Sequence, residues 1–77
     1  MVDRKDLEAI RMVRREFNRR KVDCAEADVR VLHGVLYVRG SLKGFGDVDV
    51  RHELEVICRA LRQTNRVREI VLDVKFR

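Results

Sequence analysis

The chain has 77 residues, of which 45% are hydrophobic and 40% are charged. This length allows one domain with a small core, and the apolar fraction excludes a disordered chain. Lysine and arginine number 18 against 13 aspartate and glutamate residues, so the formal net charge of +5 favours anionic partners. No run of residues approaches the roughly 20 apolar positions that cross a bilayer.

The beginning of the chain bears on its location. Residues 1–6 become charged at once and contain no apolar core of signal-peptide length. We therefore expect a cytoplasmic protein. A periplasmic location is expected only if the chain is excised from a longer exported protein.

The first predicted element is a helix over residues 4–20. Asp3 is a suitable N-cap, and Asp6 complements the positive end of the helix dipole. An apolar stripe at helical spacing is formed by Leu7, Ile10, Val13 and Phe17. Basic residues follow at the C-terminal end, where cations complement the dipole.

A β-hairpin is predicted next, because residues 29–32 and 35–39 are two β-prone runs separated by His33-Gly34. Glycine adopts positive φ without steric cost and histidine is enriched there, so these two residues favour a tight turn. Gly40 is then expected to end the second strand.

A second helix is predicted after Asp47 or Asp49, either of which can cap it. Its inner face consists of apolar residues at helical spacing, namely Val50, Leu54, Ile57, Cys58 and Leu61. Thr64 and Asn65 are expected to end this helix.

The last predicted strand has a regular period of two. Its apolar face consists of Ile70, Leu72, Val74 and Phe76, and we expect this face to be buried and the other to be wet. The predicted fold is α+β in the order α-β-β-α-β, with a three-stranded mixed sheet and two helices packed on one face. Without proline, repeat or linker, residues 1–77 are expected to form a single domain.

Residues that could support catalysis or bind a metal are few. The candidates are His33, His52, Asp47, Asp49, Cys24 and Cys58. They lack the paired spacing of structural zinc sites, and Cys58 falls on the apolar face of the second helix, where an inert buried thiol is expected. The chain also has no glycine-rich phosphate loop. We therefore expect no metal, no cofactor and no catalytic activity.

The first helix carries a cluster of basic residues. The candidate residues for binding an anion or a partner are Arg11, Arg14, Arg15, Arg19, Arg20 and Lys21. Clustered cations of this kind bind the phosphates of lipid or nucleic acid, and the alternative is a solvated, salt-bridged outer face. Phe45 stands between two glycines, and it is either an exposed docking residue or a cap over the open end of the core.

A family resemblance is carried by residues 29–43, Val29-Arg-Val-Leu-His-Gly-Val-Leu-Tyr-Val-Arg-Gly-Ser-Leu-Lys43, with a Gly-Val pair at the hairpin. This stretch resembles the core of the BON domain, the family found in bacterial osmotic-stress proteins and outer-membrane lipoproteins. Residues 54–61 resemble the second helix of that family and residues 67–74 its final strand. The resemblance implies a single non-catalytic binding module that contacts an anionic phospholipid surface or a protein partner, with Gly34 and Gly40 in structural roles.

Two other functions compete with this interpretation. An RNA-binding domain of the KH kind has a similar frame, but it uses a GxxG loop between adjacent helices that this chain lacks, so nucleic acid is the less favoured partner. The other alternative is a structural self-assembly domain, a homo-oligomer formed through a sheet edge.

Overall fold

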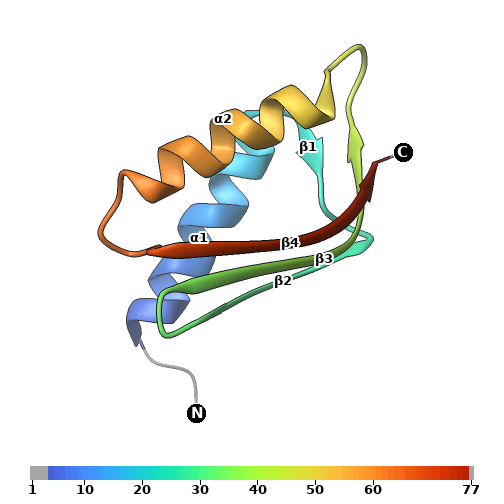
Figure 1. Ribbon diagram of the computed structural model, residues 1–77. Coiled ribbons are helices and arrows are strands. Elements are labelled where there is room, and N and C mark those ends of the chain that lie inside the picture. Colours follow the sequence, from blue (N-terminus) through green and yellow to red (C-terminus); the bar gives the residue numbers. More distant parts are fainter. Residues whose placement is uncertain (1–3, 77) are drawn as a thin grey trace.

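The computed structural model of the chain describes residues 4–76 (Figure 1). Its elements are α1 (Arg4–Arg19), β1 (Val22–Asp23), β2 (Ala27–Leu32), β3 (Val35–Gly44), α2 (Val50–Arg62) and β4 (Glu69–Phe76). The α+β class is confirmed. The predicted count of three strands is one too few. The missing strand is β1, which has only two residues and is too short to show a period in the sequence. The predicted N-cap Asp3 lies outside the described residues.

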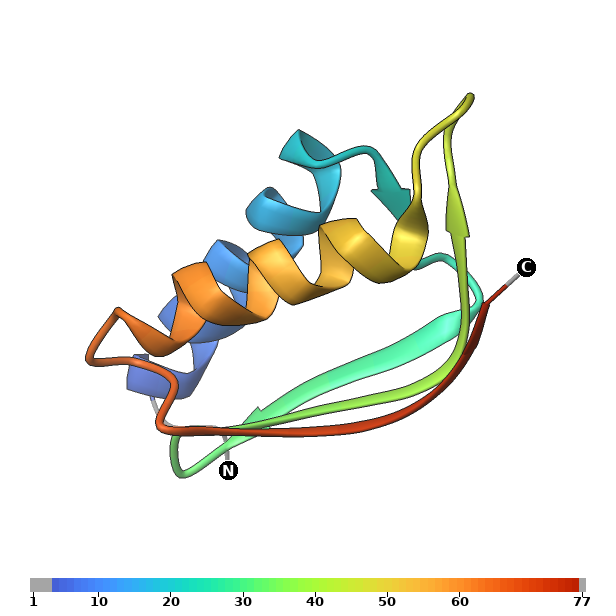
Figure 2. The same cartoon turned by 45° about the horizontal axis from the view of Figure 1, so that its top comes forward.

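Strand β3 is the centre of the sheet. It pairs antiparallel with β1 and β2 and parallel with β4, so the sheet is mixed, as predicted. Both helices lie on one face of this sheet (Figure 2). Helix α1 contacts β1 and β2, whereas α2 contacts β1, β3 and β4.

The sheet contains an irregularity between β1 and β2. The pairs Asp23–Lys43 and Ala27–Gly40 enclose three residues on the β1–β2 side and only two on β3. This excess of one residue is a β-bulge, which bends the strands. Strand β3 accordingly turns away from β2 toward β1, and the end of β4 curves alongside it (Figure 1).

Gly40 lies at this bend and has a φ of 116°. A Cβ atom at this position would stand 2.6 Å from the carbonyl oxygen of Glu26. The same oxygen accepts a hydrogen bond from the Ser41 amide at 3.3 Å. The prediction that the strand ends at Gly40 is wrong, since β3 continues to Gly44.

The core lies between the helices and the sheet. The five predicted inner residues of α2 are all buried, and the Asp49 carboxylate caps the helix by accepting a hydrogen bond from the His52 amide at 3.3 Å. The apolar stripe of α1 is partly wrong, because Leu7 is 45% exposed. Asp6 and Ala9 are buried in that part of the helix instead, on the same side as Val13.

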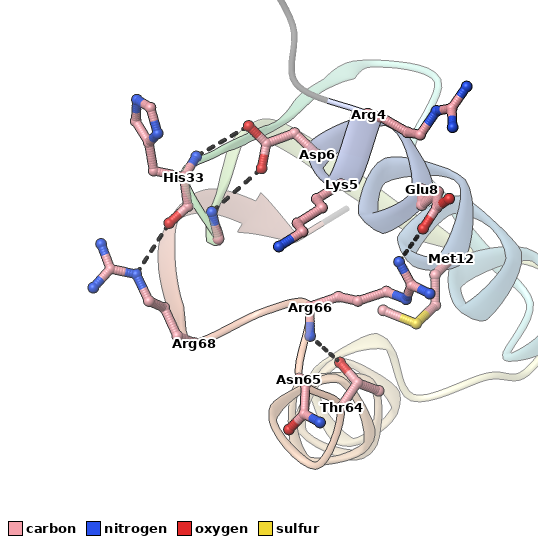
Figure 3. Close-up of a pocket in the computed structure, with 11 residues that line it drawn as sticks. Arg4, Lys5, Asp6, Glu8, Met12, His33, Thr64, Asn65, Arg66 and Arg68 are labelled. Atoms are coloured by element: carbon pink, nitrogen blue, oxygen red, sulfur yellow. Dashed lines mark hydrogen bonds and ion pairs between the residues drawn. The ribbon is translucent and has the colours of Figure 1, made fainter.

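Asp6 joins the start of α1 to the β2–β3 turn (Figure 3). Its carboxylate accepts hydrogen bonds from the backbone amides of His33 at 3.1 Å and Gly34 at 3.4 Å. Both turn residues have positive φ, 52° and 79°, as the predicted two-residue turn requires. The carboxylate therefore satisfies amides that a tight turn leaves without a backbone partner.

The prediction that one face of β4 is buried is wrong. Leu72 and Phe76 remain 43% and 37% exposed, and Ile70 and Val74 are only half-buried. The alternation is present, but β4 stands at the edge of the sheet, where α2 covers one side of it and no other described element covers the rest.

We expect Gly40→Ala to lower the free energy of unfolding by about 3 kcal/mol, because the new Cβ meets backbone and the φ is unfavourable for an L-residue. Gly46→Ala is the matched control, since Gly46 also has positive φ but a Cβ added there would meet no atom within 4 Å. We expect Gly46→Ala to lower the free energy of unfolding by about 1 kcal/mol. Urea denaturation of both variants measures the difference, and equal losses would refute a steric role for Gly40.

We expect Asp6→Ala to lower the free energy of unfolding by about 1 to 2 kcal/mol, because two turn amides lose their acceptor. Asp73→Ala serves as the control, since Asp73 is exposed and pairs with Arg39 at 3.6 Å on the surface. That loss should stay within about 0.5 kcal/mol. If the two variants unfold at the same urea concentration, the contact between Asp6 and the turn contributes nothing to stability.

Candidate functional site

The structure separates the six predicted basic residues into two groups. Arg20 is half-buried and forms an ion pair at 2.8 Å with Glu53 of α2, so it joins the two helices. The other residues, Arg11, Arg14, Arg15, Arg19 and Lys21, are exposed. Arg20 is therefore a structural residue, whereas the remaining five are accessible to a ligand.

The exposed side of α1 is strongly cationic. We call it the basic face and define it by Arg4, Arg11, Arg14, Arg15 and Arg19. The exposed acidic residue of this helix, Glu8, pairs with Arg66 after α2. Glu16 is half-buried and reaches Arg19 at 3.6 Å. Most of the positive charge on the basic face is thus left uncompensated by acidic residues of the same helix.

Phe45 lies in the loop between β3 and α2 and is 54% exposed. Of the two roles considered for this residue, the structure excludes the one in which it folds back over the core. Its amide donates a hydrogen bond at 3.0 Å to the carbonyl of Lys21, which lies in the turn after α1 and has a φ of 60°. The loop projects at the end of the molecule where α1 terminates (Figure 2).

This hydrogen bond joins the Phe45 backbone to a cationic segment of the chain. Lys21 and Arg19 are exposed at the end of α1, and Lys43 is exposed two residues before Phe45. Asp47 is an exposed acidic residue of the same loop. The loop thus carries an exposed aromatic side chain two residues after Lys43, and its backbone is hydrogen-bonded to Lys21. The sequence leaves this placement open because no local pattern fixes the conformation of a loop.

A pocket of about 860 Å³ opens at the opposite end of the sheet, between the start of α1, the β2–β3 turn and the segment after α2 (Figure 3). Its polar groups already interact with one another. Asp6 holds the turn amides, Arg66 pairs with Glu8, and the Arg68 Nε donates to the His33 carbonyl at 3.0 Å. These interactions hold together the start of α1, the β2–β3 turn and the segment after α2, so the polar groups of the pocket serve the fold.

The uncovered face of the sheet differs from the basic face of α1. Two of its cations have acidic neighbours: Arg30 pairs with Asp28 at 2.9 Å and Arg39 with Asp73 at 3.6 Å. Tyr37 is 39% exposed there. A nucleic acid bound across this face would have to displace those ion pairs, so the face is poorly suited to a phosphate backbone.

The candidate catalytic groups are dispersed. Cys58 is buried, and desolvation raises the pKa of its thiol although Arg62 lowers it in part, so the thiolate is disfavoured at neutral pH. Within residues 4–76, no three histidine, cysteine, aspartate or glutamate side chains are grouped so that they could hold a metal ion. His52 is exposed on the first turn of α2.

Two further findings bear on the function. Neither helix of the described chain combines the length and the apolar character needed to cross a membrane. Comparison with protein-family models, with curated proteins and with solved structures finds no match to this chain.

Proposed function

We propose that the chain is a non-catalytic, BON-like module that binds an anionic phospholipid surface. The observation that carries this proposal is the exposed Phe45, which is held beside the cationic end of α1 by the hydrogen bond to Lys21. An aromatic side chain next to basic residues suits the boundary between lipid headgroups and acyl chains. The basic face of α1 supplies the electrostatic part of the contact.

The two contributions differ in physical origin. Each Lys or Arg near an anionic leaflet contributes about 1 kcal/mol, and this term falls off within a Debye length. Insertion of Phe45 adds a hydrophobic term of about 1.5 to 3 kcal/mol when the ring is fully buried. Neither term alone gives firm binding, whereas their sum does, as in other proteins that need two membrane signals.

The alternatives have weaker support. A protein partner at the Phe45 loop would need a contiguous apolar patch there, whereas Phe45 is a single side chain in its loop. RNA binding of the KH kind relies on a GxxG loop between helices, and the cations on the uncovered sheet face are engaged by Asp28 and Asp73. The same basic face could attract RNA by its charge, so RNA is a necessary competitor in any binding experiment.

We expect the double variant Arg11→Ala/Arg15→Ala to bind anionic vesicles about 10- to 30-fold more weakly, because two cations of the basic face are lost. Arg30→Ala/Arg39→Ala is the matched control, since it removes the same charge from residues that are already paired on the sheet. Co-sedimentation with phosphatidylcholine vesicles containing roughly 30% phosphatidylglycerol measures both.

The same co-sedimentation assay also tests whether binding depends on salt and on anionic lipid. Binding to the anionic vesicles should fall as salt rises from about 0.05 M to about 0.5 M, because exposed charges are screened. Equal binding, or equal lack of binding, to anionic vesicles and to pure phosphatidylcholine would contradict the proposal. Tighter binding to single-stranded RNA than to vesicles would contradict it in favour of the RNA-binding alternative.

We expect Phe45→Ser to weaken vesicle binding about tenfold without altering the salt dependence, because only the hydrophobic term is lost. Leu32→Ser is the matched control, since Leu32 is 50% exposed and lies next to the turn at the far end of β3. It should leave binding unchanged. If both variants bind vesicles as the unmodified chain does, Phe45 does not insert.

A further inference from the structure

Strand β4 is unusually apolar for an exposed strand. Its apolar residues on the helix side are Ile70, Leu72, Val74 and Phe76, and Val71 lies on the other side. None of the five is buried: Leu72 and Val71 are each 43% exposed and Phe76 is 37% exposed. A long, apolar and uncovered edge strand is a template for pairing with another chain.

The opposite edge of the sheet does not share this property. Strand β2 is also at an edge, yet its helix-side residues Val29 and Val31 are only 6% and 2% exposed. Its outward residues include Asp28 and Arg30, which form an ion pair with each other. The helices therefore cover β2 more fully than β4, which α2 contacts but leaves partly exposed.

A groove of about 750 Å³ runs along this open side, between α2 and β4. Leu54 and Cys58 of α2 are buried beside it, and Leu72 and Phe76 of β4 form its outer wall. The guanidinium of Arg51 lies 5.1 Å from the centre of the Phe76 ring. The apolar core thus extends to the surface of the molecule along the groove between α2 and β4.

We propose that β4 pairs antiparallel with β4 of a second copy of this chain, so that the two sheets become one. Side chains that stand opposite each other in such a pair must point to the same face, so both are even-numbered or both odd-numbered. This leaves few registers, and the charges on the strand distinguish them.

The register with Leu72 opposite Leu72 sets Glu69 opposite Lys75 of the other copy, twice by symmetry. A two-fold axis at Asp73 would instead place two aspartates opposite each other. An axis at Val71 would place Glu69 opposite Asp73. Like charges directly opposite are destabilising and opposite charges are stabilising, which excludes the axes at Asp73 and Val71. An axis at Val74 would also pair opposite charges, Asp73 with Lys75, but it would align only residues 72–76 of each β4. The register centred on Leu72 aligns residues 69–75, so it combines favourable charges with the longer ladder.

This register also accounts for the exposed apolar groups. In it, Leu72 contacts Leu72 of the second copy, and Ile70 stands opposite Val74 of the second copy. All of these side chains lie on the helix side of the joined sheet. The two grooves then join across the axis, so that apolar side chains exposed in one copy are covered by the other. The uncovered backbone groups at the edge of β4 gain partners in the same step.

The test exchanges charges along β4. Glu69→Lys alone and Lys75→Glu alone each place like charges opposite each other at two symmetric positions, so each should raise the dimer dissociation constant about tenfold. The double variant Glu69→Lys/Lys75→Glu restores both pairs and should associate as the unmodified chain does. Sedimentation equilibrium of the full chain from about 10 μM to about 1 mM measures the mass of each.

Two further variants make the outcome decisive. Asp28→Lys on β2 changes the net charge by the same amount as Glu69→Lys and should leave association unchanged. Leu72→Arg should abolish association, while circular dichroism shows an intact fold. A one-chain mass at about 1 mM overturns the proposal, even if the groove then takes up a peptide or a detergent. Association that none of the β4 variants weakens, or that Asp28→Lys weakens equally, overturns it as well.

Discussion

The bulge opposite Gly40 is the constraint on which the rest of the structure depends. Strand β3 pairs with every other strand, and it can do so only because it bends where the β1–β2 side has one residue too many. Only a residue without a Cβ allows the Glu26 carbonyl to approach so closely at that φ. Beyond the bend, β3 reaches β1, and the chain then leads through the Phe45 loop into α2. The position of the exposed aromatic residue is thus a consequence of backbone geometry at Gly40.

The helices are distributed unevenly over this bent sheet. Helix α1 lies against β1 and β2, and its N-terminal turn is fixed to the β2–β3 turn by Asp6. Helix α2 is tied to α1 by the pair Arg20–Glu53 and contacts β1, β3 and β4, yet the inward side chains of β4 are less completely buried than those of β2. The core is closed at β2 and remains partly open at β4. Two surfaces result from this placement of the helices. The charged side of α1 points away from the core and forms the basic face, and the apolar side of β4 is left incompletely covered.

Much of this arrangement is readable from the sequence, and what is not has physical reasons. The five inner positions of α2 and the His33-Gly34 turn follow from local periodicity and local backbone preference, which single sequences record well. For Asp6 the sequence suggests only the helix dipole, because its partners are 27 and 28 residues away and no local pattern reveals them. The burial predicted for β4 fails because alternation reports which residues share a face but not whether a helix covers that face. The exposure of Phe45 likewise depends on the bend of β3, which a single glycine controls.

The two proposed surfaces are compatible in one assembly. A two-fold axis at Leu72 that relates strands of one continuous sheet is perpendicular to that sheet, so the helices of both copies lie on the same side. The basic faces of two α1 helices would then point in the same direction, and a lipid surface could bind both copies at once. Such a bivalent contact strengthens binding without any new residue, because the second contact is intramolecular. Replacing Glu69 by lysine consequently has two opposite effects on membrane binding. The added positive charge favours an anionic surface, whereas the loss of β4 pairing removes the second contact that would make binding bivalent.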